Sequence, residues 1–151
     1  MAAKMMKDCD PNIELVACGS SGPQMPTFVE WDHRVMQRLD PRFAEYISLH
    51  RYVGNTDGDS EDYLGISKAI DHQIESIDAS ARAAAAGQGS RRRTYLCFDE
   101  WNVWYRARTK EDRDGAGKFA PQLLDETYNF EDALVVAMFL LSFIRHADVV
   151  K

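Results

Sequence analysis

The order in which strand-like and helix-like segments recur constrains the fold of this 151-residue chain most strongly. Short apolar runs bounded by turn residues predict strands at residues 13–18, 43–52, 95–98 and 148–151. Helical periodicity fills the intervals, which is the βαβ pattern of an α/β fold with a parallel sheet. Because a complete (β/α)₈ barrel needs about 250 residues, four strands predict a thin doubly wound sheet or half of such a barrel.

Helix signals flank these strands. Residues 2–9 are typical of the end of a helix, stopped by Asp10-Pro11. Thr27 and Glu30 have the spacing of a capping box. The buried face expected for the next helix holds Phe28, Trp31, Val35 and Leu39. A helix over residues 60–86 is expected to bury Tyr63, Ile66, Ile70, Ile74 and Ile77. Asn129 is predicted to cap a last helix that includes Leu134, Met138, Leu141 and Phe143. Its apolar stretch, residues 133–144, is too short to span a bilayer and predicts a buried helix.

Charge and composition exclude several classes of partner. The net charge of −6 and the isoelectric point near 5.2 argue against nucleic acid and anionic membranes. The N-terminus lacks the apolar run of a signal peptide. Cys9, Cys18 and Cys97 form an odd set without metal-like spacing, so we expect reduced, mostly buried thiols in a cytoplasmic protein. No metal or cofactor is expected.

The stretch 95–105 is the candidate site. An apolar strand ends there in Asp99-Glu100, followed by Trp101, Trp104 and Tyr105. Alternation places Glu100 on the face of Leu96 and Phe98 and carries it into the mouth of the sheet. A carboxylate beside flat aromatic faces suits cleavage of a glycosidic bond. A strand-end acid capping the next helix, with tryptophans in the core, is the alternative.

Two residues at the end of the second strand are expected to reach the same mouth. His50 and Tyr52 are two positions apart and therefore share a face of the strand. A lone strand-end histidine is also often a hydrogen-bonded structural group. The loop at residues 19–23 matches neither a P-loop nor a nucleophile elbow and is expected to be a structural turn. Arg91 to Arg93 are expected to be solvated. Residues 106–118 are expected to form a charged loop and residues 119–129 an ordered but irregular segment, which together would form one wall of the pocket.

Several motifs in order resemble one enzyme family. They are residues 15–21, 25–28, 46–55, 98–105 and 128–134, of which Phe-Asp-Glu-Trp-Asn-Val-Trp-Tyr at 98–105 is the most specific. The chain resembles the α-L-arabinofuranosidases of glycoside hydrolase family 51 over essentially its whole length. The resemblance implies a retaining glycosidase that releases terminal arabinofuranose from arabinan, arabinoxylan or arabino-oligosaccharides. It also implies a partial (β/α)₈ barrel, in which residues 1–151 supply about strands five to eight and the family's β-sandwich is absent.

The resemblance assigns roles residue by residue. Glu100 would be the nucleophile, with His50 and Tyr52 orienting it and lining the furanose subsite. Trp104 would form a wall of the sugar pocket, with Trp101 nearer the aglycone. The family's acid/base is the Glu of an Asn-Glu pair, and this chain contains no such pair. Two hypotheses therefore stand: a segment of an arabinofuranosidase, or a non-catalytic half-barrel that binds a sugar or partner. We expect a homo-oligomer or a complementary half-barrel to cover the open edges.

Overall fold

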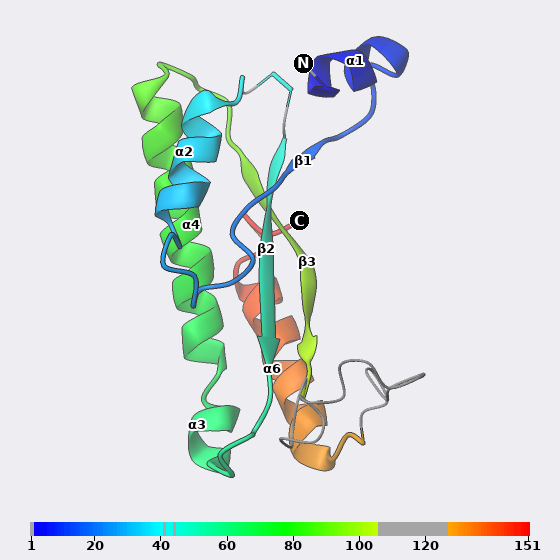
Figure 1. Cartoon of the computed structure of the whole chain (residues 1–151), viewed down its shortest axis with the longest axis vertical. Coiled ribbons are helices and arrows are strands. Elements are labelled where there is room, and N and C mark those ends of the chain that lie inside the picture. Colours follow the sequence, from blue (N-terminus) through cyan, green and yellow to red (C-terminus); the bar gives the residue numbers. More distant parts are fainter. Residues whose placement is uncertain (1, 41, 44, 106–126) are drawn as a thin grey trace, which may run out of the picture.

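The computed structural model describes residues 2–40, 42–43, 45–105 and 127–151. In chain order its elements are α1 (Ala2–Cys9), β1 (Val16–Ala17), α2 (Glu30–Arg38), β2 (Tyr46–Val53), α3 (Ser60–Leu64), α4 (Ser67–Gly87), β3 (Tyr95–Val103) and α6 (Phe130–Arg145). The strands form one parallel sheet in the order β1-β2-β3 (Figure 1). Val150 adds a parallel bridge to Leu96, so the predicted fourth segment starts beside β3. The predicted α/β class with a parallel sheet is confirmed, although β1 is shorter than expected.

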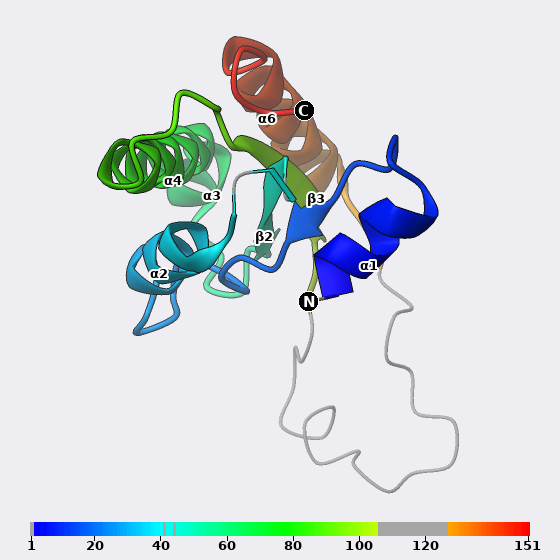
Figure 2. The same ribbon diagram turned by 90° about the horizontal axis from the view of Figure 1, so that it is seen from above.

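The helices cover one face of the sheet. Figure 2 shows α2, α4 and α6 side by side against β2 and β3, with α1 on the other side near β1. Alternate residues of the strands enter the core between sheet and helices, including Ile47 and Leu49 from β2 and Leu96 and Phe98 from β3. Helices α4 and α6 pack against them with Ile70, Ile74, Ile77, Val135 and Phe139. We call the other side of the sheet the open face.

The helix expected over residues 60–86 is divided into α3 and α4. Asp59 begins α3 by accepting hydrogen bonds from the backbone of Glu61 and Asp62. Gly65 ends it after five residues, and its N–H bonds to two carbonyls of the preceding turn. The predicted buried face is confirmed at Tyr63, Ile70, Ile74 and Ile77.

The predicted capping box at Thr27 and Glu30 is wrong. Helix α2 begins at Glu30, and the carboxylate of Asp32 accepts the backbone N–H of Val29 at 3.1 Å. Val29 has a φ of 68°, which is unusual for a β-branched side chain. The expectation that Trp31 belongs to the core is also wrong, because its side chain is 48% exposed while Asp32 and Met36 are buried. Phe28 and Val35 of the predicted face do pack against the core, so the buried face of α2 is rotated from Trp31 toward Asp32 and Met36.

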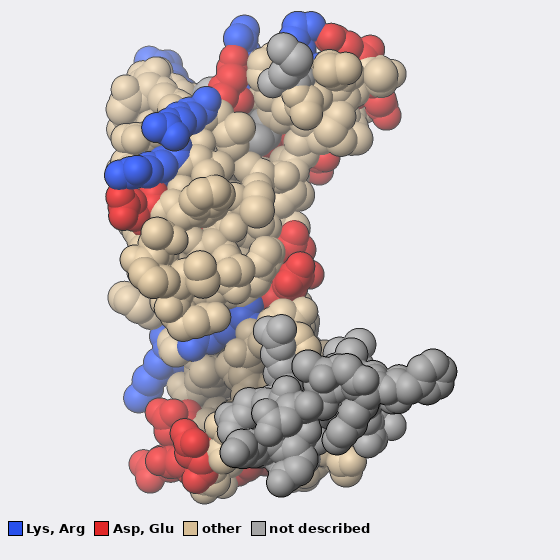
Figure 3. Space-filling model, in the orientation of Figure 1, with Lys and Arg blue, Asp and Glu red and all other residues tan. Residues whose placement is uncertain are grey.

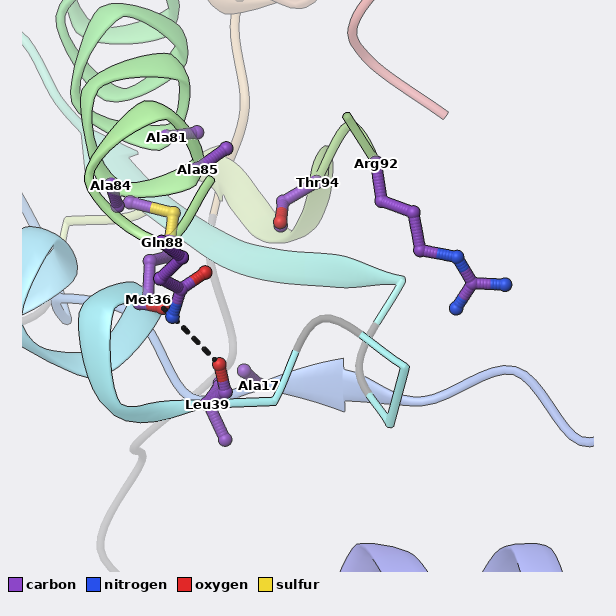
Figure 4. A pocket seen from close by; sticks show the side chains of 9 residues that line it. All are labelled: Ala17, Met36, Leu39, Ala81, Ala84, Ala85, Gln88, Arg92 and Thr94. Carbon is purple, nitrogen blue, oxygen red and sulfur yellow. Dashed lines mark hydrogen bonds between the residues drawn. The ribbon is translucent and has the colours of Figure 1, made fainter. Parts of the chain in front are cut away.

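The end of α4 holds the end of α2. The side-chain amide of Gln88 donates to the carbonyls of Met36, Gln37 and Leu39, at 3.1, 2.8 and 3.0 Å. These carbonyls belong to the last turn of α2, whose acceptors lack partners within the helix. The cavity next to this contact, shown in Figure 4, has a volume of about 10 Å³. It has room for one water molecule and is too small for an organic ligand.

Helix α6 begins as predicted, but its burial differs. Asn129 accepts the N–H of Asp132, and Asp132 accepts the N–H of Asn129, at 3.1 and 2.9 Å. The buried positions are Asp132, Val135, Phe139 and Ser142. Four large apolar side chains on α6 are exposed instead: Phe130, Leu140, Leu141 and Ile144. The expectation of a buried helix is therefore wrong for this side of α6. In the described ranges no helix is long and apolar enough to cross a membrane.

Candidate active site

A β-bulge in β3 decides where the acidic residues point. Ser48 pairs with Cys97, but His50 pairs with Glu100, so β3 holds one residue more than β2 between these pairs. A bulge of this kind reverses the alternation of the side chains that follow it. Glu100 therefore lies on the open face, whereas Leu96 and Phe98 lie in the core. The expectation that these three residues share a face is wrong for this reason.

The bulge also moves Trp101 away from Glu100. The indole ring lies 5.1 Å from the ring of Phe139 and 5.0 Å from that of Phe143, both on α6. It is partly buried against the core on the helix-covered face of the sheet. The sequence expectation had Trp101 beside the sugar pocket, and the geometry corrects it to a packing residue between β3 and α6.

The other predicted residues come together on the open face. His50 is the register partner of Glu100, and Tyr52 lies two residues further along β2. The ring of Tyr52 meets that of Trp104 edge-on, with centroids 5.0 Å apart. Because β3 continues to Val103, Glu100 lies three residues before the strand ends. Glu100, His50, Tyr52 and Trp104 therefore form one row along the carboxyl-terminal half of the sheet, where parallel α/β folds present their functional groups.

Asp99 joins this row, which sequence reasoning did not foresee. Its carboxylate oxygen Oδ1 lies 3.2 Å from Nε2 of His50. The side chain of His50 is only 14% exposed, while that of Asp99 is 42% exposed. No feature of the sequence other than the adjacent acids signals this contact, because it depends on the bulge.

The backbone of His50 is fixed from the helix side. Gln73, a buried residue of α4, donates its side-chain amide to the carbonyl of His50 at 3.1 Å. Arg51 points to the same side, as alternation predicts, and donates to Oε1 of Gln73 at 3.1 Å. Burial lowers the pKa of the Arg51 guanidinium. Gln73 thus links α4 to the strand segment that carries His50.

The neighbouring ionisable groups have partners of their own. Burial raises the pKa of the Cys97 thiol, and the charge of Asp99 adds to that effect. Cys97 pairs in register with Ser48 on the open face, and its raised pKa keeps the thiol neutral at pH 7. Cys9 and Cys18 are exposed and Cys97 is partly buried, so the expectation of mostly buried thiols is wrong. Glu30, another carboxylate that could act as an acid, lies 2.6 Å from Arg34 across one turn of α2. Glu126, a further candidate, lies outside the described residues.

The Gly-Ser loop after β1 uses its donors internally. The N–H of Gly19 donates to Ser48 at 2.9 Å, and the N–H and hydroxyl of Ser20 donate to Asp32 at 2.8 and 2.6 Å. Asp32 and Ser20 are both buried. These bonds agree with the expected structural turn, because they leave the loop few donors for a phosphate.

A buried polar cluster stands behind the carboxyl-terminal ends of the strands. Asp132 accepts hydrogen bonds from the hydroxyls of Tyr63 and Tyr105, at 2.9 and 2.6 Å. It thereby ties α3 and the segment after β3 to the first turn of α6. Beside it is a hollow of about 290 Å³ lined by Asn55, Thr56, Tyr105, Thr127 and Asn129. Of the pocket wall expected from residues 106–129, all but residues 127–129 lies outside the described residues.

Charged side chains are unevenly distributed over the surface. In Figure 3 a broad uncharged area is bordered by acidic side chains over β3 and by basic side chains below it. A basic cluster lines a different hollow, of about 460 Å³, between α4 and β3, and consists of Arg82, Arg91, Arg92 and Arg93. Asp78 contacts two of these arginines, Arg82 and Arg93, at 3.1 Å each. Within the described parts of the chain, no three His, Cys, Asp or Glu side chains are grouped to hold a metal ion.

Comparisons with known proteins agree with these motifs. The family model described as the alpha-L-arabinofuranosidase C-terminal domain matches residues 99–151. The chain is 42% identical to an intracellular exo-alpha-(1->5)-L-arabinofuranosidase of Acetivibrio thermocellus, over 99% of this chain and 30% of that protein. It is 43% identical to the intracellular exo-alpha-(1->5)-L-arabinofuranosidase 1 of Bacillus subtilis, with the same coverage.

A solved structure gives the same assignment. A family 51 alpha-L-arabinofuranosidase from Bifidobacterium longum superposes with a TM-score of 0.83 at 30% identity, over 98% of this chain and 30% of that one. The chain thus spans about a third of the length of the relatives that it matches. In motifs, sequence identity and fold, it matches a segment of the α-L-arabinofuranosidases of glycoside hydrolase family 51.

Proposed function

We propose that this chain forms the nucleophile-bearing part of a retaining exo-α-L-arabinofuranosidase. Its three-stranded sheet and the bridge at Val150 would be about strands five to eight of a (β/α)₈ barrel, with the open face turned to the barrel interior. The substrate would be a terminal α-L-arabinofuranosyl residue of arabinan, arabinoxylan or an arabino-oligosaccharide. The relatives named intracellular favour a cytoplasmic location.

The observation that carries the proposal is the position of Glu100. The bulge presents its carboxylate on the open face, in register with His50. Among the described residues Glu100 makes no hydrogen bond or ion pair, so its lone pairs are available to an electrophile. Tyr52 and Trp104, in edge-on contact, would form an aromatic wall for the apolar face of a furanose ring.

The chemistry divides between this chain and a second carboxyl group. A carboxylate oxygen of Glu100 attacks the anomeric carbon, and the bond from that carbon to the leaving oxygen breaks with its electron pair. A second carboxylic acid, about 5–5.5 Å away in retaining enzymes, gives the leaving oxygen a proton. The same group then takes a proton from the water that cleaves the glycosyl ester. The Asn-Glu pair that supplies this acid in the family is missing from the chain.

The proposal is tested by trapping the first step. The chain is incubated with 4-nitrophenyl α-L-arabinofuranoside, whose leaving group needs little protonation, and its intact mass is measured after an acid quench. We expect the gain of one pentosyl group, which peptide mapping places on Glu100. Glu100→Gln should prevent it, while Glu75→Gln, at an exposed glutamate of α4, should not. A native chain without an adduct, or an adduct elsewhere, contradicts the assignment.

The alternative is a non-catalytic half-barrel that binds a sugar or partner through the aromatic residues. The edge-on pair of Tyr52 and Trp104 on the open face is the observation that favours it. Calorimetry with arabino-oligosaccharides separates the two functions. Binding that Trp104→Ala abolishes, without any glycosylation of Glu100, would support the binding protein.

A further inference from the structure

His50 has two acidic neighbours on the open face, and the structure treats them differently. Glu100 is its register partner in the ladder between β2 and β3. Asp99, however, is the residue whose carboxylate contacts the imidazole, at 3.2 Å from Nε2. We propose that Asp99 is a positioning residue that holds the ring of His50 and thereby keeps the carboxylate of Glu100 unpaired. The inference rests on the proposed role of Glu100 as nucleophile.

The bulge explains why Asp99 can take this place. Without the extra residue, Asp99 and Glu100 would point to opposite faces of β3, and only one of them could meet His50. With it, Glu100 is the register partner of His50 on the open face while the carboxylate of Asp99 contacts the imidazole of the same histidine. Bulges that re-aim a side chain are frequent next to active sites. Here the bulge re-aims Glu100 to the open face. Asp99, and not Glu100, contacts the imidazole of His50, which is the register partner of Glu100.

Burial of the side chain and a hydrogen bond to the backbone restrict the position of the His50 imidazole. Its side chain is 14% exposed, and Gln73 of α4 holds the carbonyl of the same residue at 3.1 Å. A negative oxygen 3.2 Å from Nε2 attracts a hydrogen on that nitrogen, so the charge of Asp99 favours the tautomer protonated at Nε2. The other ionisable groups near His50 are Glu100 and Cys97 on β3 and Tyr52 on β2, while Arg51 points to the helix side.

The consequence for Glu100 follows from electrostatics. A carboxylate that accepts a hydrogen bond from a histidine is stabilised in its charged form and becomes a weaker nucleophile. Removing Asp99 frees the imidazole to turn to its register partner. Asp99 therefore acts through His50 and does not touch the sugar.

The chain contains a matched pair for comparison. Oδ1 of Asp71 lies 3.2 Å from Nε2 of His146, the same separation as between Asp99 and His50. This pair joins α4 to the end of α6, away from the open face. Asp71→Ala is therefore the control for the general effect of losing the acidic partner of a histidine.

The test is a double-mutant cycle read by NMR on the chain labelled with ¹⁵N-histidine. The ring ¹⁵N shifts of His50, assigned with His50→Gln, are compared in the native chain, Glu100→Gln, Asp99→Ala and the double variant. We expect Glu100→Gln to leave the His50 signals in place in the native background and to move them in the Asp99→Ala background. Asp99→Asn should retain the native pattern, because an amide oxygen can still accept from Nε2. Asp71→Ala should move the signals of His146 alone.

Equal effects of Glu100→Gln in both backgrounds would overturn the proposal, because His50 and Glu100 would then be coupled whether or not Asp99 is present. If Asp99→Ala fails to fold, Asp99→Val, which suits a strand, takes its place in the cycle. A second readout is the rate at which the aryl arabinofuranoside esterifies Glu100. Asp99→Ala should slow this labelling at least tenfold, Asp99→Asn should largely restore it, and Asp71→Ala should leave it unchanged. A chain that is never labelled refutes the proposed function, while the NMR cycle still decides the role of Asp99.

Discussion

Phe98 and Trp101 both pack against Phe143 of α6, with ring centroids 4.9 and 5.0 Å away, although they are three positions apart in one strand. In a regular strand an odd separation places two side chains on opposite faces. The shared contact is therefore the packing signature of the bulge that turns Glu100 to the open face. The bulge in β3 thus determines both that Trp101 packs against α6 and that Glu100 lies on the open face.

This relationship predicts that the two tryptophans differ in their effect on stability. Trp101→Ala removes a ring that packs on Phe139 and Phe143 and should lower the free energy of unfolding by about 2–4 kcal/mol. Trp104→Ala removes a ring that is also partly buried but lies on the open face beside Tyr52, and should cost less, about 1–2 kcal/mol. Urea unfolding followed by circular dichroism measures both. Equal costs would mean that Trp101 is not the packing residue.

How far the sequence allowed the fold to be predicted depends on the kind of interaction. Apolar runs and capping residues act locally, so β2, the start of β3 and the Asn129 cap of α6 are where the sequence predicted them. Strand β3 nevertheless continues to Val103, and the helix predicted over residues 60–86 is divided into α3 and α4. The bulge depends on how β3 pairs with β2, which no local pattern encodes. Trp101 was misplaced for that reason, and the contact of Asp99 with His50 was not foreseen.

A second group of errors concerns which helix face is buried. Asp32 is buried on the core-facing side of α2 because its carboxylate accepts hydrogen bonds from the backbone N–H groups of Val29 and Ser20. An acidic residue is therefore found where hydropathy predicts an apolar one. In α6 the apolar residues extend around the helix, and hydropathy alone does not choose between the face of Phe139 and that of Leu141. Tertiary contacts make these choices.

Two glycines should respond oppositely to alanine. A Cβ at Gly19 would lie 2.0 Å from the carbonyl oxygen of Ser48, so the loop would have to move. Gly19→Ala should therefore destabilise the chain by about 1–3 kcal/mol. Gly87, the last residue of α4, has open space around it, and Gly87→Ala should be neutral or stabilising by up to about 1 kcal/mol. Thermal unfolding of both variants checks this, and a stable Gly19→Ala would contradict the close approach.

The tyrosine cluster around Asp132 predicts loss of stability at alkaline pH. Burial raises the pKa of the Tyr63 hydroxyl above its ordinary value, and the hydrogen bond to Asp132 raises it further. Burial and Asp132 raise the pKa of Tyr105 in the same direction. Because the folded pKa values lie above the unfolded value of about 10, this contribution is complete below pH ~10 and is lost as pH rises beyond it.

The measurement is the urea midpoint between pH 8 and pH 11. Tyr63→Phe should lower stability by about 1 kcal/mol at pH 8, since it removes one hydrogen bond to a charged acceptor, and should weaken the decline above pH 10. Tyr128→Phe, at an exposed ring, is the control and should keep the native decline. A native chain whose midpoint is flat across this range would contradict the burial of these hydroxyls.

The exposed side of α6 predicts self-association. Phe130, Leu141 and Ile144 are 79%, 52% and 72% exposed on one helix. Leu141→Lys with Ile144→Glu should reduce association at high protein concentration by removing apolar surface, with less than about 0.5 kcal/mol lost per exposed site. Sedimentation velocity of the native and doubly substituted chains gives the answer. An unchanged distribution of species would direct attention to the strand edges instead.

The last prediction concerns turnover by the chain as it stands. With 4-nitrophenyl α-L-arabinofuranoside we expect a burst of about one nitrophenolate per chain and then a stall, because the arabinosyl ester of Glu100 has no base to activate water. Azide needs no base, since it is already an anion. Its terminal nitrogen can attack the anomeric carbon, the ester bond then breaks, and the carboxylate of Glu100 is released with arabinosyl azide as product. Added azide should therefore convert the burst into continuous release, and Glu100→Gln should abolish both. Sustained hydrolysis without azide that still depends on Glu100 would show that another acid serves as the base, and Asp99 and Glu30 would be the next residues to replace.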